Sequence, residues 1–163
     1  MALLHPKVER QLHELGVIYD VMDCDPEFAD TAAFCEKYGV DPADSANTIL
    51  VASKRPPDVF GVCVALATTR LDVNRAVRDA LGVKKLSFAP ADVTLAVTGM
   101  EIGGVTPFGL AADLPILVDA AVMERPEIVL GGGNRTSKLR LAPSQLVRLD
   151  EATVIDGLAA PLS

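Results

Sequence analysis

A glycine- and proline-rich segment at residues 101–109 is the part of this sequence best suited to chemistry. It reads Glu-Ile-Gly-Gly-Val-Thr-Pro-Phe-Gly. Glycine lets a backbone N–H group approach a ligand and proline fixes φ, so the segment can form a rigid loop of donors for the oxyanion of an ester carbonyl. The candidate residues for that role are Gly103, Gly104, Val105, Thr106 and Pro107. A tight turn that needs glycine only for its backbone geometry is the alternative.

A second glycine cluster, residues 131–135, could also approach a ligand. It reads Gly-Gly-Gly-Asn-Arg, and Arg135 could present its planar guanidinium to a phosphate or carboxylate. The cluster has neither the GxxxxGK[ST] form of a P-loop nor a dinucleotide-binding fingerprint. Gly132 and Gly133 are therefore candidates for substrate binding, with a bulge in a sheet as the structural alternative.

Two further polar residues stand at predicted element ends. Arg70 precedes a predicted helix and could offer a cation to a phosphate, while Asp72 could cap that helix. Asp119 follows the apolar run 116–118, where it is either a site carboxylate at a strand end or a turn former. Arg70 and Asp119 are kept as candidate binding residues.

Histidine and cysteine do not show the spacing of a catalytic or metal site. His5 and His13 belong to the first predicted helix, far in sequence from both glycine clusters. Cys24, Cys35 and Cys63 are an odd set without CxxC spacing, which indicates packed, reduced thiols. We therefore predict no metal ion and no cofactor.

Length and charge narrow the class of protein. The chain has 163 residues, half of them apolar, which predicts one domain over residues 1–163. A formal charge of −7 argues against a protein that holds DNA or another nucleic acid by a broad basic face, so any nucleic-acid contact must be local or helped by a partner. No apolar run approaches the ~18–20 residues of a membrane helix, and the N-terminus is unlike a secretion signal. A cytoplasmic protein that does not enter membranes is the expectation.

The elements that must position these residues alternate between helix and strand. Helices are predicted at residues 6–15, from Asp30 or Thr31 to Gly39, and at 72–81, 89–97 and 143–149. Strands are predicted at residues 17–22, 48–52, 59–67, 116–118, 128–130, 139–141 and 153–155, the second and third joined as a hairpin. This interleaving is typical of a mixed α/β (α+β) fold.

The glycine segment and its surroundings resemble a known family. The run from Thr98 to Leu110, followed by 114–119, is similar to the signature of the YbaK and prolyl-tRNA-synthetase-associated editing domains. Residues 70–73, 81–86, 131–133 and 141–146 match in family order, so the resemblance covers essentially the whole chain. It implies a mixed sheet curled into a partial barrel surrounded by helices.

The resemblance also implies an activity, which is the hydrolysis of the ester that joins a wrong amino acid to tRNA. The loop from Gly103 to Pro107 would gather the ester and the terminal ribose by backbone contacts, without a metal or a catalytic triad. The substrate would be tRNA for proline carrying alanine, cysteine or a similarly small amino acid, in a small pocket lined by apolar residues such as Phe28 and Ile49. The implied substrate-binding residues are Phe28, Asn47, Thr48, Arg70, Asp119, Gly132, Gly133 and Arg135.

Two positions depart from the family pattern. Family members usually carry lysine just before the threonine at position 48, and this chain has Asn47, which can hydrogen-bond but brings no charge. YbaK-like members carry a small polar residue where Leu130 stands. A non-catalytic module of the same fold that binds tRNA or a synthetase is therefore the alternative, and a hydrolase of another small ester is a third hypothesis. A synthetase is a candidate partner because it could deliver the tRNA.

Overall fold

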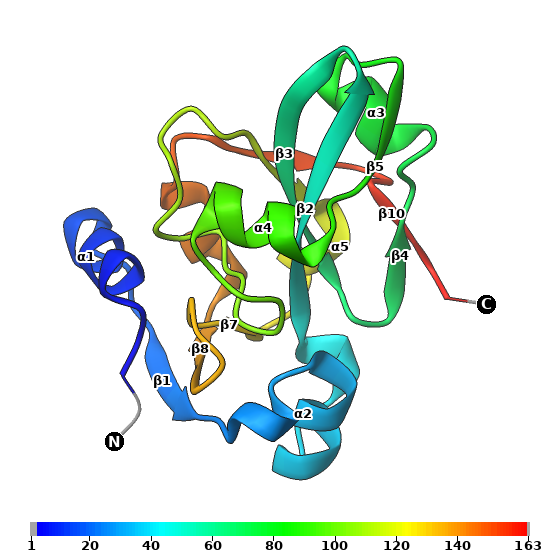
Figure 1. Ribbon diagram of the computed structural model, residues 1–163. Helices are drawn as coiled ribbons and strands as arrows, with labels where there is room; N and C mark the ends of the chain where they lie inside the picture. The colour runs from blue at the N-terminus through cyan, green and yellow to red at the C-terminus, as the bar shows by residue number, and fades with distance from the viewer. Residues whose placement is uncertain (1–2, 163) are drawn as a thin grey trace.

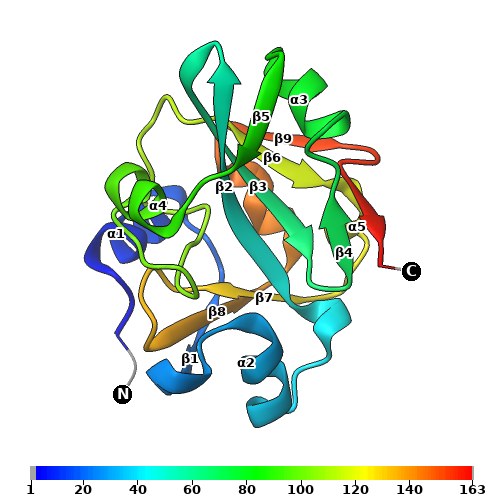
Figure 2. The ribbon, with the colours of Figure 1, turned by 45° about the vertical axis from the view of Figure 1, so that its right-hand side comes forward.

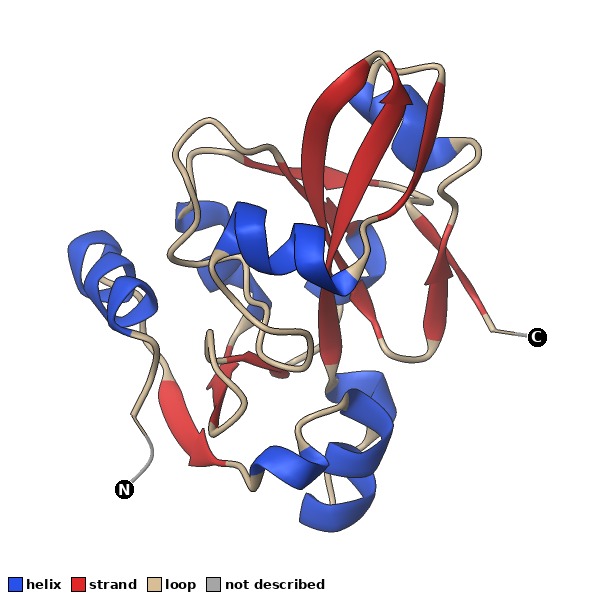
Figure 3. Cartoon of the chain, in the orientation of Figure 1, coloured by secondary structure: helices blue, strands red, loops and turns tan. Residues whose placement is uncertain are grey.

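The computed structural model describes residues 3–162 (Figures 1 and 3). The helices are α1 Pro6–Leu15, α2 Thr31–Tyr38, α3 Ala76–Leu81, α4 Ala91–Thr98 and α5 Ala120–Met123, with 3-10 helices η1 Pro26–Phe28, η2 Pro42–Asp44 and η3 Pro143–Arg148. The strands are β1 Asp20–Asp23, β2 Ala46–Arg55, β3 Pro57–Leu66, β4 Thr69–Leu71, β5 Lys85–Phe88, β6 Ile116–Asp119, β7 Ile128–Gly131, β8 Ser137–Leu141, β9 Ala152–Ile155 and β10 Ala159–Pro161.

The largest sheet has the strand order β5-β2-β3-β6-β9. Strands β5, β2 and β3 are antiparallel, whereas β3, β6 and β9 run parallel. Alternate residues of β3 point to different cores, since Val62 and Val64 join one apolar cluster and Cys63 and Ala65 join another. Because side chains alternate across a strand, the second half of β3, residues 61–66, is buried on both faces.

A second, three-stranded antiparallel sheet has the order β1-β8-β7. It meets the large sheet through a parallel bridge between Ser45, just before β2, and Val129 of β7. Figure 2 shows β7 and β8 next to the start of β2 and close to α2. The third sheet pairs β4 with β10, so that residues near the C-terminus lie beside the strand that follows the β2–β3 hairpin.

The strand pairing does not form the partial barrel that the resemblance implied. Within residues 3–162 the strands make three separate sheets, and the large sheet ends at β5 and β9, which do not pair with each other. The architecture is a mixed α+β fold built on a five-stranded mixed sheet. The two smaller sheets contact the inner strands of the large one, β7 beside β2 and β4 beside β3.

Most predicted elements exist, with shifts at their ends. Helix α1 is confirmed with its bounds, and the His5 side chain accepts a hydrogen bond from the backbone N of Lys7 at its start (3.2 Å), which gives this histidine a capping role. The helix predicted from Asp72 begins only at Ala76, because residues 72–75 form a turn. Strands β5 and β10 were not predicted, since Lys-Leu-Ser-Phe and Ala-Ala-Pro lack the apolar, β-branched runs that marked short strands such as β6 and β7.

Candidate functional site

A cavity of about 180 Å³, the central cavity, lies where the start of β2 meets the glycine loop, β7, β8 and the start of α2. It is lined by Asp30, Thr31, Ala46, Asn47, Thr48, Ile49, Ile102, Gly103, Val105, Gly131 and Lys138. The structure therefore brings four predicted site residues together here, namely Asn47, Thr48, Gly103 and Val105. They come from two segments more than fifty residues apart in the sequence.

The two glycine clusters are packed directly against each other. Gly133 N donates to Gly104 O (2.7 Å). A Cβ on Gly104 would lie 2.5 Å from the carbonyl carbon and oxygen of Asn134, and a Cβ on Gly131 would meet the carbonyl oxygens of Val105 and Gly104. Glycine at these positions permits a close backbone approach that any side chain would block. The second cluster thus serves to position the first.

The loop has backbone donors free for a ligand. Gly104 N donates to Glu101 O (2.9 Å), which holds the turn in shape. Among residues 3–162, no acceptor is recorded for the N–H groups of Gly103 and Val105, and both residues line the central cavity. Two N–H groups of this kind are suited to a carbonyl oxygen that gains negative charge.

Arg135 joins the loop to the segment before α2 rather than lining the central cavity. Its Nη1 donates to Ile102 O (2.6 Å) and to Asp30 Oδ1 (3.2 Å), and its Nη2 donates to Pro26 O (2.8 Å). The contacts tie the loop and the segment before α2 to the same guanidinium. The placement assigns Arg135 to holding the loop and Asp30 together at one rim of the cavity.

The β2 wall of the central cavity contributes an unpaired hydroxyl. Thr48 Oγ1 is buried and has no hydrogen-bond partner among the described residues. Beside it, Thr31 Oγ1 donates to Asn47 Oδ1, which joins α2 to β2. A buried polar atom without a partner costs free energy unless a ligand or water satisfies it, so Thr48 is suited to a polar ligand.

Lys138 lines the same cavity and was not predicted from the sequence. It is 6% exposed, and its Nζ donates to Ala29 O (2.7 Å) and Gly103 O (2.8 Å). Removal of the ammonium from water lowers the pKa of Lys138 below the ordinary value of a lysine. In the sequence, Lys138 stands between the polar residues 134–137 and the predicted strand 139–141, and a lysine at the edge of a short strand is normally exposed.

A smaller apolar pocket of about 90 Å³ adjoins the central cavity. The two share Thr48, Ile49, Ile102, Gly103 and Val105. The remaining lining of the small pocket is Leu50, Ala89 and Thr94. Its size and lining suit a short side chain.

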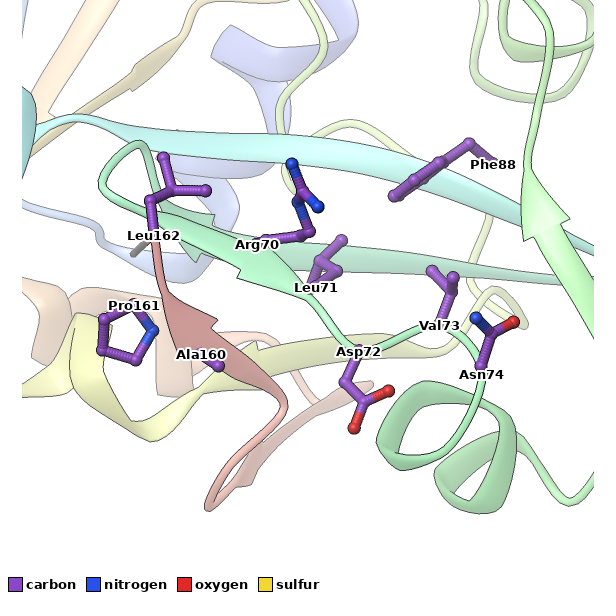
Figure 4. Close-up of a pocket in the computed structure, with 9 residues that line it drawn as sticks. All are labelled: Arg70, Leu71, Asp72, Val73, Asn74, Phe88, Ala160, Pro161 and Leu162. Atoms are coloured by element: carbon purple, nitrogen blue, oxygen red, sulfur yellow. The ribbon is translucent and has the colours of Figure 1, made fainter.

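An open groove extends from the central cavity across the sheet. A linking pocket of about 170 Å³ contains Asn47 and Ile49 at one end and Arg70, Phe88 and Leu162 at the other. It leads into an outer groove of about 690 Å³, which is lined by Arg70, Leu71, Asp72, Val73, Asn74, Phe88, Ala160, Pro161 and Leu162. In Figure 4, Arg70 lies between Leu162 and Phe88, and Asp72 points away on the other side of β4.

Other predicted site residues do not line the central cavity. Phe28 lies in η1 beneath Lys37, whose Nζ is 5.2 Å from its ring centre. Asp119 is 2% exposed and accepts from Ala159 N (3.3 Å), so it joins β6 to β10, and burial raises its pKa. Thr106 and Pro107 are buried behind the loop.

Gly132 and Gly133 also face protein rather than the cavity. A Cβ on Gly133 would lie 2.5 Å from His5 Cβ, and one on Gly132 would meet Ser137 and Leu4. His5 N donates to Gly132 O (3.1 Å), which attaches the start of α1 to this turn. The turn is therefore packed between α1 and β8.

Two further observations concern metals and membranes. Within residues 3–162, no three His, Cys, Asp or Glu side chains come together in a way that could hold a metal ion. None of the helices in that range has the length and apolar character needed to cross a bilayer. The three cysteines are buried free thiols.

The fold and the site define a domain with a small polar cavity closed by a glycine loop and continued by an open groove. A family model of the aminoacyl-tRNA editing domain matches residues 25–149. The match includes β2, the loop and β8, and it covers well over half of the chain. This protein therefore belongs to the aminoacyl-tRNA editing domain family, as the resemblance in the sequence indicated.

Individual relatives agree with this assignment. The uncharacterized protein YwhH of Bacillus subtilis (strain 168) is 30% identical over 127 residues, which is 78% of each chain. The crystal structure of APE2540, a hypothetical protein, superposes with a TM-score of 0.84 at 23% identity, covering 94% of this chain and 99% of that one. A proposed trans-editing enzyme for prolyl-tRNA synthetase superposes with a TM-score of 0.78 at 22% identity, covering 94% and 98%. These structures share the fold.

Proposed function

We propose that this protein is a trans-editing aminoacyl-tRNA deacylase, acting as one domain over residues 1–163 in the cytoplasm. The observation that carries the proposal is the central cavity, which is lined by Gly103, Val105 and Thr48. Among residues 3–162, the N–H groups of the first two have no protein acceptor and the hydroxyl of Thr48 has no partner. Such a site can hold an ester carbonyl and stabilise its oxyanion without a triad. Family membership supports the ester of an aminoacyl-tRNA as the substrate.

The adjoining apolar pocket supports a small amino acid as the group removed. At about 90 Å³, lined by Leu50, Ala89 and Val105, it accepts the side chain of alanine or cysteine. One neighbour superposes on this chain and is described as acting for prolyl-tRNA synthetase, which makes mischarged tRNA for proline the first substrate to test. A size-based pocket discriminates by only about 1–3 kcal/mol per methylene, so closely related amino acids are expected to overlap.

The groove is suited to hold the 3′ end of the tRNA. We propose that the terminal ribose sits at the linking pocket, with the preceding unpaired nucleotides in the outer groove. Phe88 is 48% exposed there and offers a face for a base, and the exposed Arg70 offers a cation for a phosphate. With a formal charge of −7, the chain has no broad basic surface to add to this contact, and a synthetase that delivers the tRNA is a compatible partner.

The test is deacylation of alanyl-, cysteinyl-, seryl- and prolyl-tRNA for proline by the wild type, Thr48→Val and Thr106→Val. Both threonines carry buried hydroxyls without a partner, but only Thr48 lines the cavity. Valine has nearly the same shape, so both variants are expected to fold. We expect Thr48→Val to lower kcat/KM by about tenfold, as for loss of one hydrogen bond, and Thr106→Val to leave it unchanged.

Three other outcomes would change the proposal. Equal losses in both variants would show that the loop as a whole, and not the cavity, governs activity. No hydrolysis of any substrate, together with retained binding of tRNA or of a synthetase, would replace the enzyme with the binding module. Hydrolysis of free amino acid esters with no preference for tRNA would replace it with a general esterase.

Gly103→Ala is a less specific test of the site than Thr48→Val. A Cβ on Gly103 would meet Arg135 and Asp30, and its φ of +93° is strained for other residues. Gly103→Ala would therefore disturb the loop as well as the chemistry. Thr48→Val removes one atom of the site and leaves the backbone unchanged.

A further inference from the structure

Lys138 is a buried cation that the proposed function does not yet use. It lies in β8, the central strand of the β1-β8-β7 sheet, and pairs with Met22 on one side and Gly131 on the other. Only 6% of it is exposed. Lysine is almost never buried to this extent unless its charge has a partner, so the site must supply a reason.

The ammonium is held by neutral oxygens. Its two hydrogen bonds go to the carbonyls of Ala29 and Gly103, and Nζ lies 5.2 Å from the ring centre of Phe34. An ammonium has three N–H donors, so one remains after these two bonds. The ion pairs among residues 3–162 do not include Lys138, and the neighbouring Asp30 pairs with Arg135. A buried positive charge therefore borders a cavity with one donor left over.

We propose that Lys138 is the catalytic cation of the central cavity and that it stabilises the oxyanion formed from the ester carbonyl. Family members usually carry lysine at position 47, in β2, whereas Asn47 is uncharged. Lys138 would supply the positive charge to the same cavity from β8. Its hydrogen bond to Gly103 O also holds the loop against the cavity. The inference rests on the proposed function and names Lys138 as the residue whose charge stabilises the oxyanion.

The chemical step is a hydrolysis that consumes one water. The water oxygen bonds to the ester carbon, and the carbonyl electron pair moves to oxygen, where Lys138 and the N–H groups of Gly103 and Val105 face the new negative charge. The carbon–oxygen bond to the ribose then breaks. The proton from water goes to the ribose oxygen, which leaves the free amino acid and a tRNA with its 3′ end restored. The lysine keeps its proton throughout.

The first experiment measures kcat and KM for Lys138→Met and Lys138→Gln on the aminoacyl-tRNA that the wild type hydrolyses best. Methionine keeps the apolar stem, and glutamine keeps a donor for the two carbonyls without the charge. We expect kcat to fall about 100-fold in both with KM little changed, because the charge is needed mainly in the transition state. Lys37→Met is the matched control, since Lys37 is exposed and also lies 5.2 Å from a phenylalanine ring.

A second experiment separates the charge from a purely structural bond. Asn47→Lys is added to each Lys138 variant, which places an ammonium in the same cavity from β2. We expect it to restore kcat at least about tenfold, since an ion in a cavity acts through its field. A structural bond between β8 and Gly103 could not be replaced from β2. Failure of this rescue, in variants with wild-type melting temperatures, would overturn the assignment.

A pair of adenosine analogues tests Lys138 without turnover. One carries an alanyl group as a 3′ amide, and the other carries a 1-aminoethylphosphonate as a 3′ ester, which mimics the tetrahedral anion. We expect Lys138→Gln to weaken the phosphonate about 100-fold and the amide hardly at all. Equal weakening of both analogues would make Lys138 a structural residue. If the wild type hydrolyses no aminoacyl-tRNA, the proposed function fails, and this pair still decides whether Lys138 binds the anion.

The pH profile gives a further readout. The charged and titratable groups around Lys138 are Cys24, Cys35, Asp30 and Arg135; loss of hydration dominates and lowers the pKa of Lys138. Since the protonated form is the active one, kcat corrected for spontaneous hydrolysis should fall as pH rises, at a pH below that of an ordinary lysine. A wild-type profile that continues to rise to the ordinary pKa of lysine would contradict the role.

Discussion

The central cavity and the outer groove differ in how firmly they are built. Around the cavity, the loop is held by Gly104 against Asn134, by Arg135 and by Lys138. The outer groove is lined by exposed side chains, among them Phe88, and by the final short strand β10. A preorganised site suits chemistry, and an open, adaptable surface suits a mobile single strand. Under the proposed function, we expect variants of the cavity to change kcat and variants of the groove to change KM.

The largest effect is expected from blocking the close backbone contact between Gly104 and Asn134, on which the cavity depends. Gly104→Ala places a Cβ 2.5 Å from the backbone of Asn134, which cannot move aside without shifting the second glycine cluster. We expect loss of activity and a drop of about 3 kcal/mol or more in the free energy of unfolding, as for overpacking in a core. Urea denaturation and deacylation measure the two quantities.

Gly39→Ala is the matched control for this change. Its Cβ would meet nothing within 4 Å, so the only cost is the left-handed φ of +68°, about 1 kcal/mol. It lies at the end of α2, away from the cavity, and kcat should be unchanged. Similar losses of stability in the two variants would mean that the contact between the glycine clusters is not a close one.

Phe88→Ala tests the groove by removing the aromatic face. Loss of stacking on one base is expected to cost about 1–3 kcal/mol, seen as a rise in KM with kcat retained. Steady-state kinetics on the preferred aminoacyl-tRNA would show it. Leu95→Ala is the control, since Leu95 is 48% exposed as well but lies outside the groove. A fall in kcat without a change in KM would mean that Phe88 acts on the chemical step, and it would contradict the division of roles between the cavity and the groove.

The smallest effect is expected for Arg70→Ala. One phosphate contact on a single strand changes the slope of log affinity against log salt by about 0.7. The variant should bind tRNA more weakly at low salt and converge with the wild type at high salt. Arg10→Ala in α1 removes the same charge from an exposed position outside the groove. If both arginines alter the salt dependence equally, the effect comes from net charge and not from the groove.

The elements of the fold with strong local signals were predictable. Helix α1 has apolar spacing, a proline at its start and Gly16 at its end, and the β2–β3 hairpin has two long apolar runs around a proline turn. The short strands β4, β5 and β10 were not, because Thr-Arg-Leu, Lys-Leu-Ser-Phe and Ala-Ala-Pro do not stand out as apolar runs. The expected partial barrel was wrong because hydrogen bonds between strands decide whether a sheet closes, and a residue pattern does not contain them.

The sequence could predict those site residues that stand out by composition or by resemblance to the family. Gly103 and Asn47 could be singled out by composition and by resemblance, and the structure places both at one cavity. Phe28 and Asp119 looked equally suitable, and the structure places them against Lys37 and Ala159 instead. A side chain's neighbours depend on packing between segments, which a linear pattern does not contain.

The amino-acid sequence by itself determined the family, the glycine loop and the net negative charge, because these depend on residue identity, order and charge. Only the tertiary structure decided that the second glycine cluster supports the first and that Lys138 is buried beside Gly103. Such contacts join residues about thirty positions apart. Their proximity is set by the packing of β7 and β8 against the loop, and no local propensity encodes it.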